Sequence, residues 1–270
     1  MVIKETIIKG STDINLCLLA DIHYYPNYRL KTFRDLLDKI KILKPDYICI
    51  TGDIIDYNEI LNEANMNYLY NFIMYLGLIS KVIISLGNHD LETKYGSFKY
   101  PIEMINEIKK IPNVYLLDNE TITFNNITFI GYTETFNIDR EKGCEDIVIN
   151  EVNNLLNNIT DNYNILLSHN PLYLNKEEVY NKIDNFNKIN LILSGHTHNG
   201  MLPNFIKTNT LLITPMKRWF KKNGRGHFIK NNTHFVVTGG VVKLSKTAHV
   251  LHLFNPLFAI NIDNIIIKKD

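Results

Sequence analysis

The sequence predicts an α/β protein in which two packed, mixed β-sheets are flanked by helices. Two observations predict this fold. Short apolar runs that resemble strands alternate with stretches of helical spacing, and such alternation is typical of α/β architectures. In the final third of the chain β-like runs predominate, which favours a second sheet packed on the first. No Pro/Gly/Ser-rich linker and no repeat period interrupts the 270 residues, so we expect a single domain over residues 1–270.

The expected strands are short apolar runs that end in polar or glycine clusters. Continuous apolar character over such a short run is typical of a strand buried on both faces. The runs lie at residues 14–20, 46–51, 81–86, 127–132, 164–168 and 191–194, and further β-like runs lie at 211–214, 234–238 and 264–268.

The expected helices follow from apolar residues at helical spacing. Residues 60–76, 102–108 and 147–156 carry this pattern weakly. Residues 30–43 carry it clearly, because one face would hold Leu30, Phe33, Leu36, Leu37, Ile40 and Leu43.

Composition and charge limit the classes of partner. The hydrophobic fraction of 45% and the charged fraction of 21% are those of an ordinary soluble globular protein. A net charge of +1 gives no overall attraction to polyanions, so nucleic acid is not expected as a partner. Composition and charge leave the oligomeric state open.

Cysteine usage and hydropathy point to the cytoplasm. Cys17, Cys49 and Cys144 are too few for a disulfide framework, and the first two read as small core residues within apolar runs. The N-terminal residues lack the apolar segment of a signal peptide. The most hydrophobic window, residues 70–86, is interrupted by polar residues and reads as a buried helix and strand. We therefore expect a cytoplasmic protein without a signal peptide or transmembrane helix.

Polar side chains follow five of the expected strands at the point where each strand ends. In open α/β sheets the ligand crevice lies just beyond the carboxyl ends of the strands. Each residue alone has an ordinary explanation as a turn, a helix cap or a surface residue. Together they predict a cation site, because so many carboxylates and imidazoles would otherwise converge without a charge to bind. The residues are Asp21, His23, Asp53, Asn88, His89, Asp90, His169, His196 and His198.

The ligand types indicate which cations would bind. Imidazole and carboxylate without cysteine suit manganese, iron, zinc or cobalt, whereas an all-oxygen site would suit magnesium or calcium. The candidate ligands outnumber one coordination sphere, so we expect two ions. A carboxylate that bridges two ions about 3.5–4 Å apart is a known arrangement for activating a bridging water.

The ordered motifs resemble those of the calcineurin-like metallophosphoesterases. Asp-x-His, Gly-Asp, Gly-Asn-His-Asp, His and Gly-His-x-His follow one another between Asp21 and His198. The resemblance implies a β-sandwich flanked by helices, and two divalent ions, with manganese expected first and iron or zinc as alternatives. It also implies the ligands: Asp21, His23 and His198 for the first ion, Asp53 as the bridge, and Asn88, His169 and His196 for the second.

The resemblance implies catalytic roles as well. His89 would face the leaving group without binding a metal, and Asp90 would orient it. Asp56, in Gly-Asp-Ile-Ile-Asp, stands where the purple acid phosphatase branch has a metal-binding tyrosine, which argues against that branch. The motifs carry no arginine to clamp a phosphate, which argues against a protein phosphatase.

We therefore expect a metal-dependent phosphohydrolase, either a phosphodiesterase or a pyrophosphatase, that uses a two-metal-bridged hydroxide. A phosphomonoesterase and a catalytically silent metal-binding scaffold are the alternatives. The membrane-associated, diester-cleaving bacterial branch is favoured. However, Asn199-Gly200-Met201 replaces the Gly-Gly-Gln that continues the last motif in many members of that branch.

Two stretches of the C-terminal third bear on the substrate. Residues 217–225 are basic and aromatic, so Arg218 and Arg225 are candidate substrate-binding residues for an anion or a lipid headgroup; a solvated loop is the alternative. Residues 248–260 are apolar and contain Pro256, and they read as a core strand and turn or as a membrane-contact patch. We therefore expect a small phosphate ester or a lipid-linked substrate, and peripheral contact with the inner membrane face.

Overall fold

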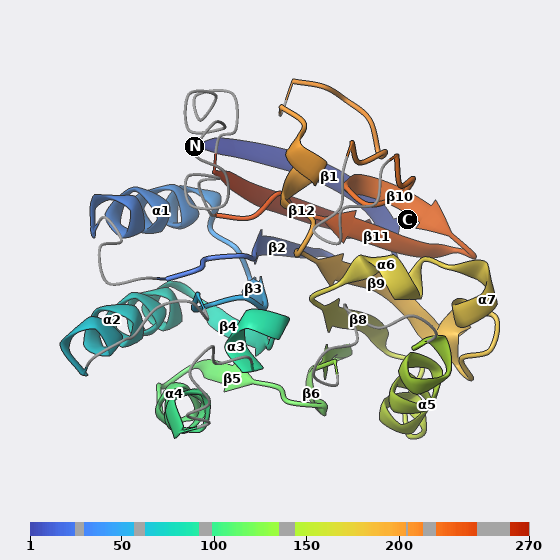
Figure 1. Cartoon of the computed structure of the whole chain (residues 1–270), viewed down its shortest axis with the longest axis horizontal. Coiled ribbons are helices and arrows are strands. Elements are labelled where there is room, and N and C mark those ends of the chain that lie inside the picture. Colours follow the sequence, from blue (N-terminus) through green and yellow to red (C-terminus); the bar gives the residue numbers. More distant parts are fainter. Residues whose placement is uncertain are drawn as a thin grey trace.

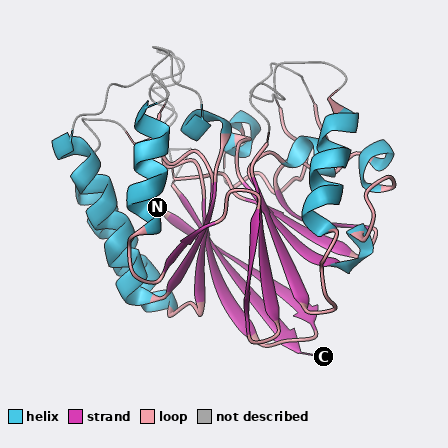
Figure 2. Ribbon diagram, turned by 90° about the horizontal axis from the view of Figure 1, so that it is seen from below, coloured by secondary structure: helices cyan, strands magenta, loops and turns pink. Residues whose placement is uncertain are grey.

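A computed structural model describes residues 1–24, 30–56, 63–91, 99–134, 144–203, 205–212, 220–241 and 260–269. Two six-stranded β-sheets pack against each other, and helices lie on both outer sides (Figures 1 and 2). This arrangement confirms the predicted α/β fold with two packed, mixed sheets. Both sheets place parallel strands at their centres, so several strands direct their carboxyl ends toward one edge.

The first sheet has the strand order β1-β12-β2-β3-β4-β5. Strands β2 to β5 are parallel to one another, whereas β12 is antiparallel to β2. The strand bounds are Val2–Gly10 for β1, Ile14–Leu19 for β2, Tyr47–Thr51 for β3, Lys81–Ser85 for β4, Val114–Leu116 for β5 and Asn261–Lys269 for β12.

The second sheet has the strand order β10-β11-β9-β8-β7-β6. Strands β7, β8, β9 and β11 are parallel, and antiparallel β6 and β10 close the two edges. The bounds are Glu120–Phe124 for β6, Ile127–Tyr132 for β7, Tyr163–Ser168 for β8, Ile189–Ser194 for β9, Gly226–Lys230 for β10 and Thr233–Val237 for β11.

Helices cover the outer face of each sheet. α1, α2 and α4 pack on the first sheet, and α5, α6 and α7 pack on the second. Among the short helices, α3 follows β4, η1 precedes β9 and η2 follows β9. The bounds are Leu30–Leu43 (α1), Glu63–Ile79 (α2), Asn88–Leu91 (α3), Lys99–Lys109 (α4), Glu145–Leu156 (α5), Pro171–Leu174 (α6), Glu177–Tyr180 (α7), Phe186–Lys188 (η1) and His198–Met201 (η2).

The central strands are apolar throughout because both of their faces are buried. In β2, Cys17 and Leu19 face the cluster under the helices, whereas Leu16 and Leu18 face the core between the sheets. Most of the remaining inter-sheet core comes from β3, β4, β7, β8, β9 and β12, and aliphatic and aromatic side chains predominate in it. Continuous apolar runs are therefore the sequence signature of these strands.

Edge strands account for most of the differences from the sequence prediction. The interior strands lie where they were predicted, as does helix α1 at residues 30–43. The pattern of continuous apolar runs missed β1, β5, β6 and β10. Of the strand expected at 211–214, residues 211 and 212 belong to no strand, and the rest lie outside the described residues. Along strand β1 exposed residues alternate with less exposed ones, and only Ile8 is buried, because only one face of the strand is covered.

The structure bears on the predictions for the cysteines, the helices and the apolar stretch 248–260. All three cysteines are free and buried, which confirms the prediction that Cys17 and Cys49 are small core residues. None of the described helices is long and apolar enough to cross a membrane. Of the apolar stretch 248–260, only Ile260 is described, and its side chain is buried. The expected membrane patch otherwise lies outside the described residues, and the cytoplasmic location and single-domain interpretation stay predictions.

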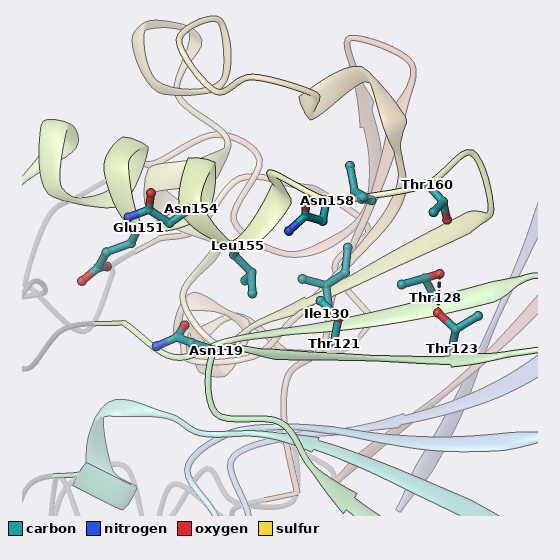
Figure 3. A pocket seen from close by; sticks show the side chains of 11 residues that line it. Asn119, Thr121, Thr123, Thr128, Ile130, Glu151, Asn154, Leu155, Asn158 and Thr160 are labelled. Atoms are coloured by element: carbon teal, nitrogen blue, oxygen red, sulfur yellow. Dashed lines mark hydrogen bonds between the residues drawn. The ribbon is translucent and has the colours of Figure 1, made fainter.

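A groove of about 470 Å³ lies beside α5 on the outer face of the second sheet (Figure 3). It is lined by residues of the β6–β7 hairpin, by α5 and by the segment that follows α5. Ile130 and three threonines line it on the side of the strands, and Glu151, Asn154 and Leu155 line it on the side of α5. None of the polar residues predicted at the strand ends lines this groove.

Strands β10 and β11 share a pair of facing imidazoles. Nε2 of His227 and Nδ1 of His234 lie 2.9 Å apart, and the two rings are nearly coplanar, at 5°. Burial lowers the pKa of both side chains, and His227 lowers that of His234 further. Such a pair shares one proton between its facing nitrogens, so protonation of both rings would bring two cations into contact.

We predict that this pair makes stability depend on pH. Because the folded-state pKa values lie below the unfolded value of about 6.5, the neutral pair contributes its full stability above that pH, and the contribution is lost as the pH falls toward the folded-state pKa. The unfolding free energy of the wild type should therefore fall more between about pH 7.5 and pH 5.5 than that of His234→Asn. Chemical denaturation measures both, and equal falls would contradict the prediction.

Candidate metal centre

The predicted polar residues converge at the carboxyl edge of both sheets. Asp21 and His23 follow β2, and Asp53 follows β3. Asn88, His89 and Asp90 begin α3 directly beyond β4. From the second sheet, His169 follows β8, while His196 and His198 follow β9. His169 from the second sheet lies beside Asp53 from the first, and His198 lies beside Asp21, so the centre lies where the two carboxyl edges meet.

Asp53 lies at the middle of the cluster and is 1% exposed. Its Oδ2 atom lies 3.1 Å from Nε2 of His169, 3.5 Å from Nε2 of His23 and 3.9 Å from Nε2 of His89. Its Oδ1 atom accepts the backbone N–H of His89 at 2.8 Å. One carboxylate therefore faces imidazoles from three different strand ends.

Asp21, which is fully buried, is the second carboxylate of the centre. Its Oδ1 atom lies 3.8 Å from Nε2 of His198, 3.9 Å from Nε2 of His23 and 4.0 Å from Nε2 of His169. The backbone N–H of His196 donates to both carboxylate oxygens, at 3.0 and 3.1 Å. Asp21 thus joins the loops that follow β2 and β9.

The side chains form two groups that fit a divalent cation. Asp21, His23 and His198 form one group, and Asp53, His169 and His196 form the other; within each, the ligand atoms lie within 4.8 Å of one another. His23 also lies in a third group, with Asp56 and His89. This donor set of imidazoles and carboxylates suits manganese, iron or zinc.

Buried polar atoms without hydrogen bonds also fit bound cations. Nε2 of His23 and Oδ1 of Asn88 are buried and have no hydrogen-bond partner among the described residues. Such atoms are costly unless something pairs with them. Nδ1 of His169 lies 2.8 Å from the carbonyl oxygen of Thr51. A bond to that carbonyl places the proton on Nδ1 and leaves Nε2 as the electron-pair donor.

The backbone turns sharply at most of these positions. Asp21, His23, Asp53, His196 and His198 all adopt the left-handed conformation, with φ between 44° and 66°. Non-glycine residues rarely adopt it, at a cost of roughly 1–2 kcal/mol each. Left-handed turns at the strand ends direct consecutive polar side chains inward, so this strain is concentrated where the ligands converge.

Glycines allow close packing around both carboxylates. A Cβ atom added to Gly87 would lie 2.3 Å from Oδ1 and 2.4 Å from the backbone nitrogen of Asp53. A Cβ atom added to Gly195 would lie 2.7 Å from Oδ2 of Asp21, and one at Gly240 would lie 2.7 Å from its Cβ atom. The glycines in the Gly-Asn-His-Asp and Gly-His-x-His motifs are thus required by space as well as by turn geometry.

Electrostatic interactions within the centre are strong because its groups are buried. Burial raises the pKa of Asp53, but His169, His89 and His23 outweigh it and hold the pKa well below its usual value. Burial lowers the pKa of His169, yet Asp53 and Asp21 raise it well above normal. Burial dominates at His23 and lowers its pKa to about 4. In the metal-free chain the centre is thus a buried ion pair, and cations that bind there displace protons.

His89 is more exposed than the buried histidines around it, with its side chain 22% exposed. Its Nδ1 atom lies 3.7 Å from Oδ1 of Asp56. Burial lowers the pKa of His89, but the carboxylates of Asp53 and Asp56 outweigh it and raise the pKa above its ordinary value. The sequence alone did not identify Asp56 as the neighbour of His89. The available signal was that Asp56 lies three residues after the predicted ligand Asp53.

Asp90 is fully buried and binds backbone amides. Its Oδ1 atom accepts the N–H groups of Ile54 and Ile55, at 2.8 and 3.1 Å, and its Oδ2 atom accepts that of Gly87 at 2.8 Å. Burial and Asp53 raise the pKa of Asp90 to about 6. Asp90 therefore joins the loop that carries Asp53 to the loop that carries His89, and its expected role in orienting His89 stays a prediction.

The two arginines predicted to bind substrate have different outcomes. Arg218 lies outside the described residues. Arg225 is described and is 3% exposed. Its guanidinium donates from Nη1 to the carbonyl oxygen of Asn199 at 3.3 Å and from Nη2 to that of Pro203 at 3.5 Å. The Arg225 side chain therefore contacts the loop that follows His198. Contact between Arg225 and a substrate stays a prediction.

Comparison with known proteins agrees with the motifs. The sequence model of the family described as calcineurin-like phosphoesterase matches residues 14–200. A metallophosphoesterase of Campylobacter jejuni is 28% identical over 190 residues, which cover 70% of this chain but 45% of that protein. A metallophosphoesterase of Aquifex aeolicus is 28% identical over 229 residues, which cover 83% of this chain and 78% of the other.

Two solved phosphatase structures are distantly similar. A dimetal phosphatase from the zebrafish Danio rerio is 13% identical with a TM-score of 0.45, over 84% of this chain and 87% of that one. A phosphatase from Mycoplasma pneumoniae is 14% identical with a TM-score of 0.41, over 86% and 73% of the two chains.

We predict that Gly87→Ala disrupts the centre. The added methyl would overlap the backbone and carboxylate of Asp53, which cannot both move without displacing the neighbouring ligands. We expect the variant to lose most of its bound manganese, measured by elemental analysis after gel filtration, and to lose about 1–3 kcal/mol of stability. Gly10→Ala is the control, because its methyl would meet only the side chains of Ile267 and Tyr163. Unchanged manganese content in Gly87→Ala would contradict the prediction.

Proposed function

Because the chain belongs to the calcineurin-like phosphoesterase family, we propose that it is a phosphodiesterase that depends on two divalent ions, manganese in the first instance. One observation carries the proposal. The buried carboxylate of Asp53 lies between imidazoles from different strand ends, with Nε2 of His169 at 3.1 Å and Nε2 of His23 at 3.5 Å. A single carboxylate in this position is suited to bridge two cations.

The ligands are divided between the two sides of Asp53. Asp21, His23 and His198 would hold one ion, and Asn88, His169 and His196 would hold the other. The two groups of ligand atoms that fit a cation support this division, as does the buried amide oxygen of Asn88. When bound, the two ions would supply Lewis-acid activation of the phosphoryl group and of a water molecule.

His89 acts as the proton donor to the leaving group. The Asp56 carboxylate beside Nδ1 stabilises the protonated ring, which can then carry a proton at Nε2, the nitrogen on the Asp53 side of the ring. Partial exposure of His89 leaves room for a substrate to approach it. An imidazole with a raised pKa keeps its proton to a higher pH than an ordinary histidine does, which suits a general acid.

The charges near the centre favour a diester over a monoester. Proteins often clamp a dianionic phosphate with guanidinium groups. Among the described residues, the charges that act on Asp53 and His89 come from imidazoles and carboxylates, and Arg225 binds backbone carbonyls instead. The more weakly charged phosphate of a diester needs no such clamp. Assignment to the membrane-associated, diester-cleaving branch stays a prediction.

Hydrolysis of paired aryl phosphates tests the proposal. Metal-stripped protein is refilled with manganese, zinc, iron or magnesium and assayed with bis(4-nitrophenyl) phosphate and with 4-nitrophenyl phosphate. We expect manganese to restore diester turnover in the wild type, and Asp53→Asn to lose at least about a thousandfold because the shared ligand is weakened. Asp38→Asn, an exposed carboxylate on α1, is the matched control.

The other outcomes each reject part of the proposal. A preference for the monoester would reject the diester assignment and direct attention to phosphatase substrates. Absence of turnover with every ion, in a chain that binds two, would reject the enzyme and favour a metal-binding scaffold. Full activity of Asp53→Asn would reject the shared carboxylate.

We predict that His89→Ala keeps both ions but loses about 10²–10⁴-fold in kcat on diesters with poor leaving groups. The loss should be smaller with 4-nitrophenolate, which leaves without a proton. Parallel assays of an alkyl aryl diester series measure this dependence. An equal loss across all leaving groups would show that His89 does not supply a proton.

A further inference from the structure

The loop that carries His198 has an unusual backbone conformation. His198, Asn199 and Gly200 are all left-handed, with φ values of 45°, 58° and 59°. Consecutive left-handed residues are costly unless surrounding contacts fix them. The position of His198 therefore depends on whatever holds this loop.

Three hydrogen bonds hold the loop from one side. The hydroxyl of Thr197 donates to the carbonyl oxygen of Gly224 at 2.8 Å. The guanidinium of Arg225 donates to the carbonyl oxygens of Asn199 and Pro203, at 3.3 and 3.5 Å. Thr197 and Arg225 are 2% and 3% exposed, so these bonds are shielded from water. The adjacent residues Gly224 and Arg225 thus contact the loop before and after His198.

Gly224 and Arg225 together form a clamp on this loop, and packing holds the clamp in place. Leu211 is fully buried, and a Cβ atom added to Gly200 or to Gly224 would lie 2.6 or 2.4 Å from its side chain. The backbone N–H of Gly224 donates to the carbonyl oxygen of Asn209 at 3.0 Å, and that of Leu211 donates to Lys221 at 2.7 Å. The loop and the clamp therefore share one buried leucine, and the clamp is anchored independently of the loop.

We propose that Arg225 and Thr197 are positioning residues for the ion held by Asp21, His23 and His198, an inference that rests on the proposed function. The contacts reach the loop through its backbone on both sides of His198. The match to the family ends at residue 200, so Arg225 and Gly224 belong to the part of the chain beyond it. The C-terminal third thereby contributes to the metal centre without supplying a ligand.

Loss of the clamp weakens the binding of only one of the two ions. His196 has its own support, because its backbone N–H donates to the Asp21 carboxylate and the N–H of Gly195 donates to the carbonyl oxygen of His169. Loss of the clamp therefore releases His198 and leaves His169 and His196 in place. The guanidinium fork matches two carbonyls at once, which the single ammonium of a lysine cannot do.

Manganese binding tests the proposal. The full chain and its variants Arg225→Ala, Arg225→Lys, Thr197→Val and Thr197→Ser are titrated with manganese, with the ions counted and electron paramagnetic resonance recorded. We expect Arg225→Ala and Thr197→Val to bind one ion normally and the other about 10–100-fold more weakly, with the dinuclear signal replaced by a mononuclear one. Thr197→Ser, which keeps its hydroxyl, should bind like the wild type, and Arg225→Lys should be intermediate.

Arg34→Ala, which removes an exposed arginine from α1, is the matched control. Thermal unfolding identifies variants that fail to fold, and Thr197→Val keeps the test decisive if Arg225→Ala is one of them. Normal binding of both ions by both variants, with a raised KM in Arg225→Ala, would overturn the proposal and favour a substrate contact. Equal weakening of both ions in a folded variant would also overturn it. A wild type that binds no ions would instead contradict the proposed function itself.

Discussion

Two buried carboxylates, Asp21 and Asp53, set the constraint on which the rest of the centre depends. Charges removed from water are costly unless opposite charges and hydrogen-bond donors surround them. Here the surrounding groups are imidazoles from four strand ends and the backbone N–H groups of His89 and His196, and glycines provide the space for them. Divalent cations would complete this compensation, which is why a metal centre follows from the burial.

The fold meets this constraint by bringing parallel strands from both sheets to one edge. Each strand is rigid because it is buried on both faces, so its end is a fixed point from which a side chain can be directed. Left-handed turns then place successive polar residues on the same side. Asp90 and the carbonyl of Thr51 fix the loops and the tautomer of His169. Backbone strain at the edge is thus balanced by hydrogen bonds behind it.

The sequence predicts this architecture best where a strand is buried on both faces and polar site residues directly follow it. Interior strands were predictable from apolar runs, whereas edge strands such as β1 were not, because one exposed face breaks the run. The strand-end residues were predictable because Asp, Asn and His recur at equivalent positions. The sequence did not predict that His89 lies beside Asp56 or that Arg225 contacts Asn199. Both depend on turn angles and on contacts between segments that the local pattern does not encode.

Anomalous diffraction from crystals grown with manganese would show whether two ions share Asp53. We expect two peaks about 3.5–4 Å apart, one on either side of Asp53. One peak should be ligated by Asp21, His23 and His198, and the other by Asn88, His169 and His196. A single peak, or two peaks that do not share Asp53, would contradict the two-ion centre.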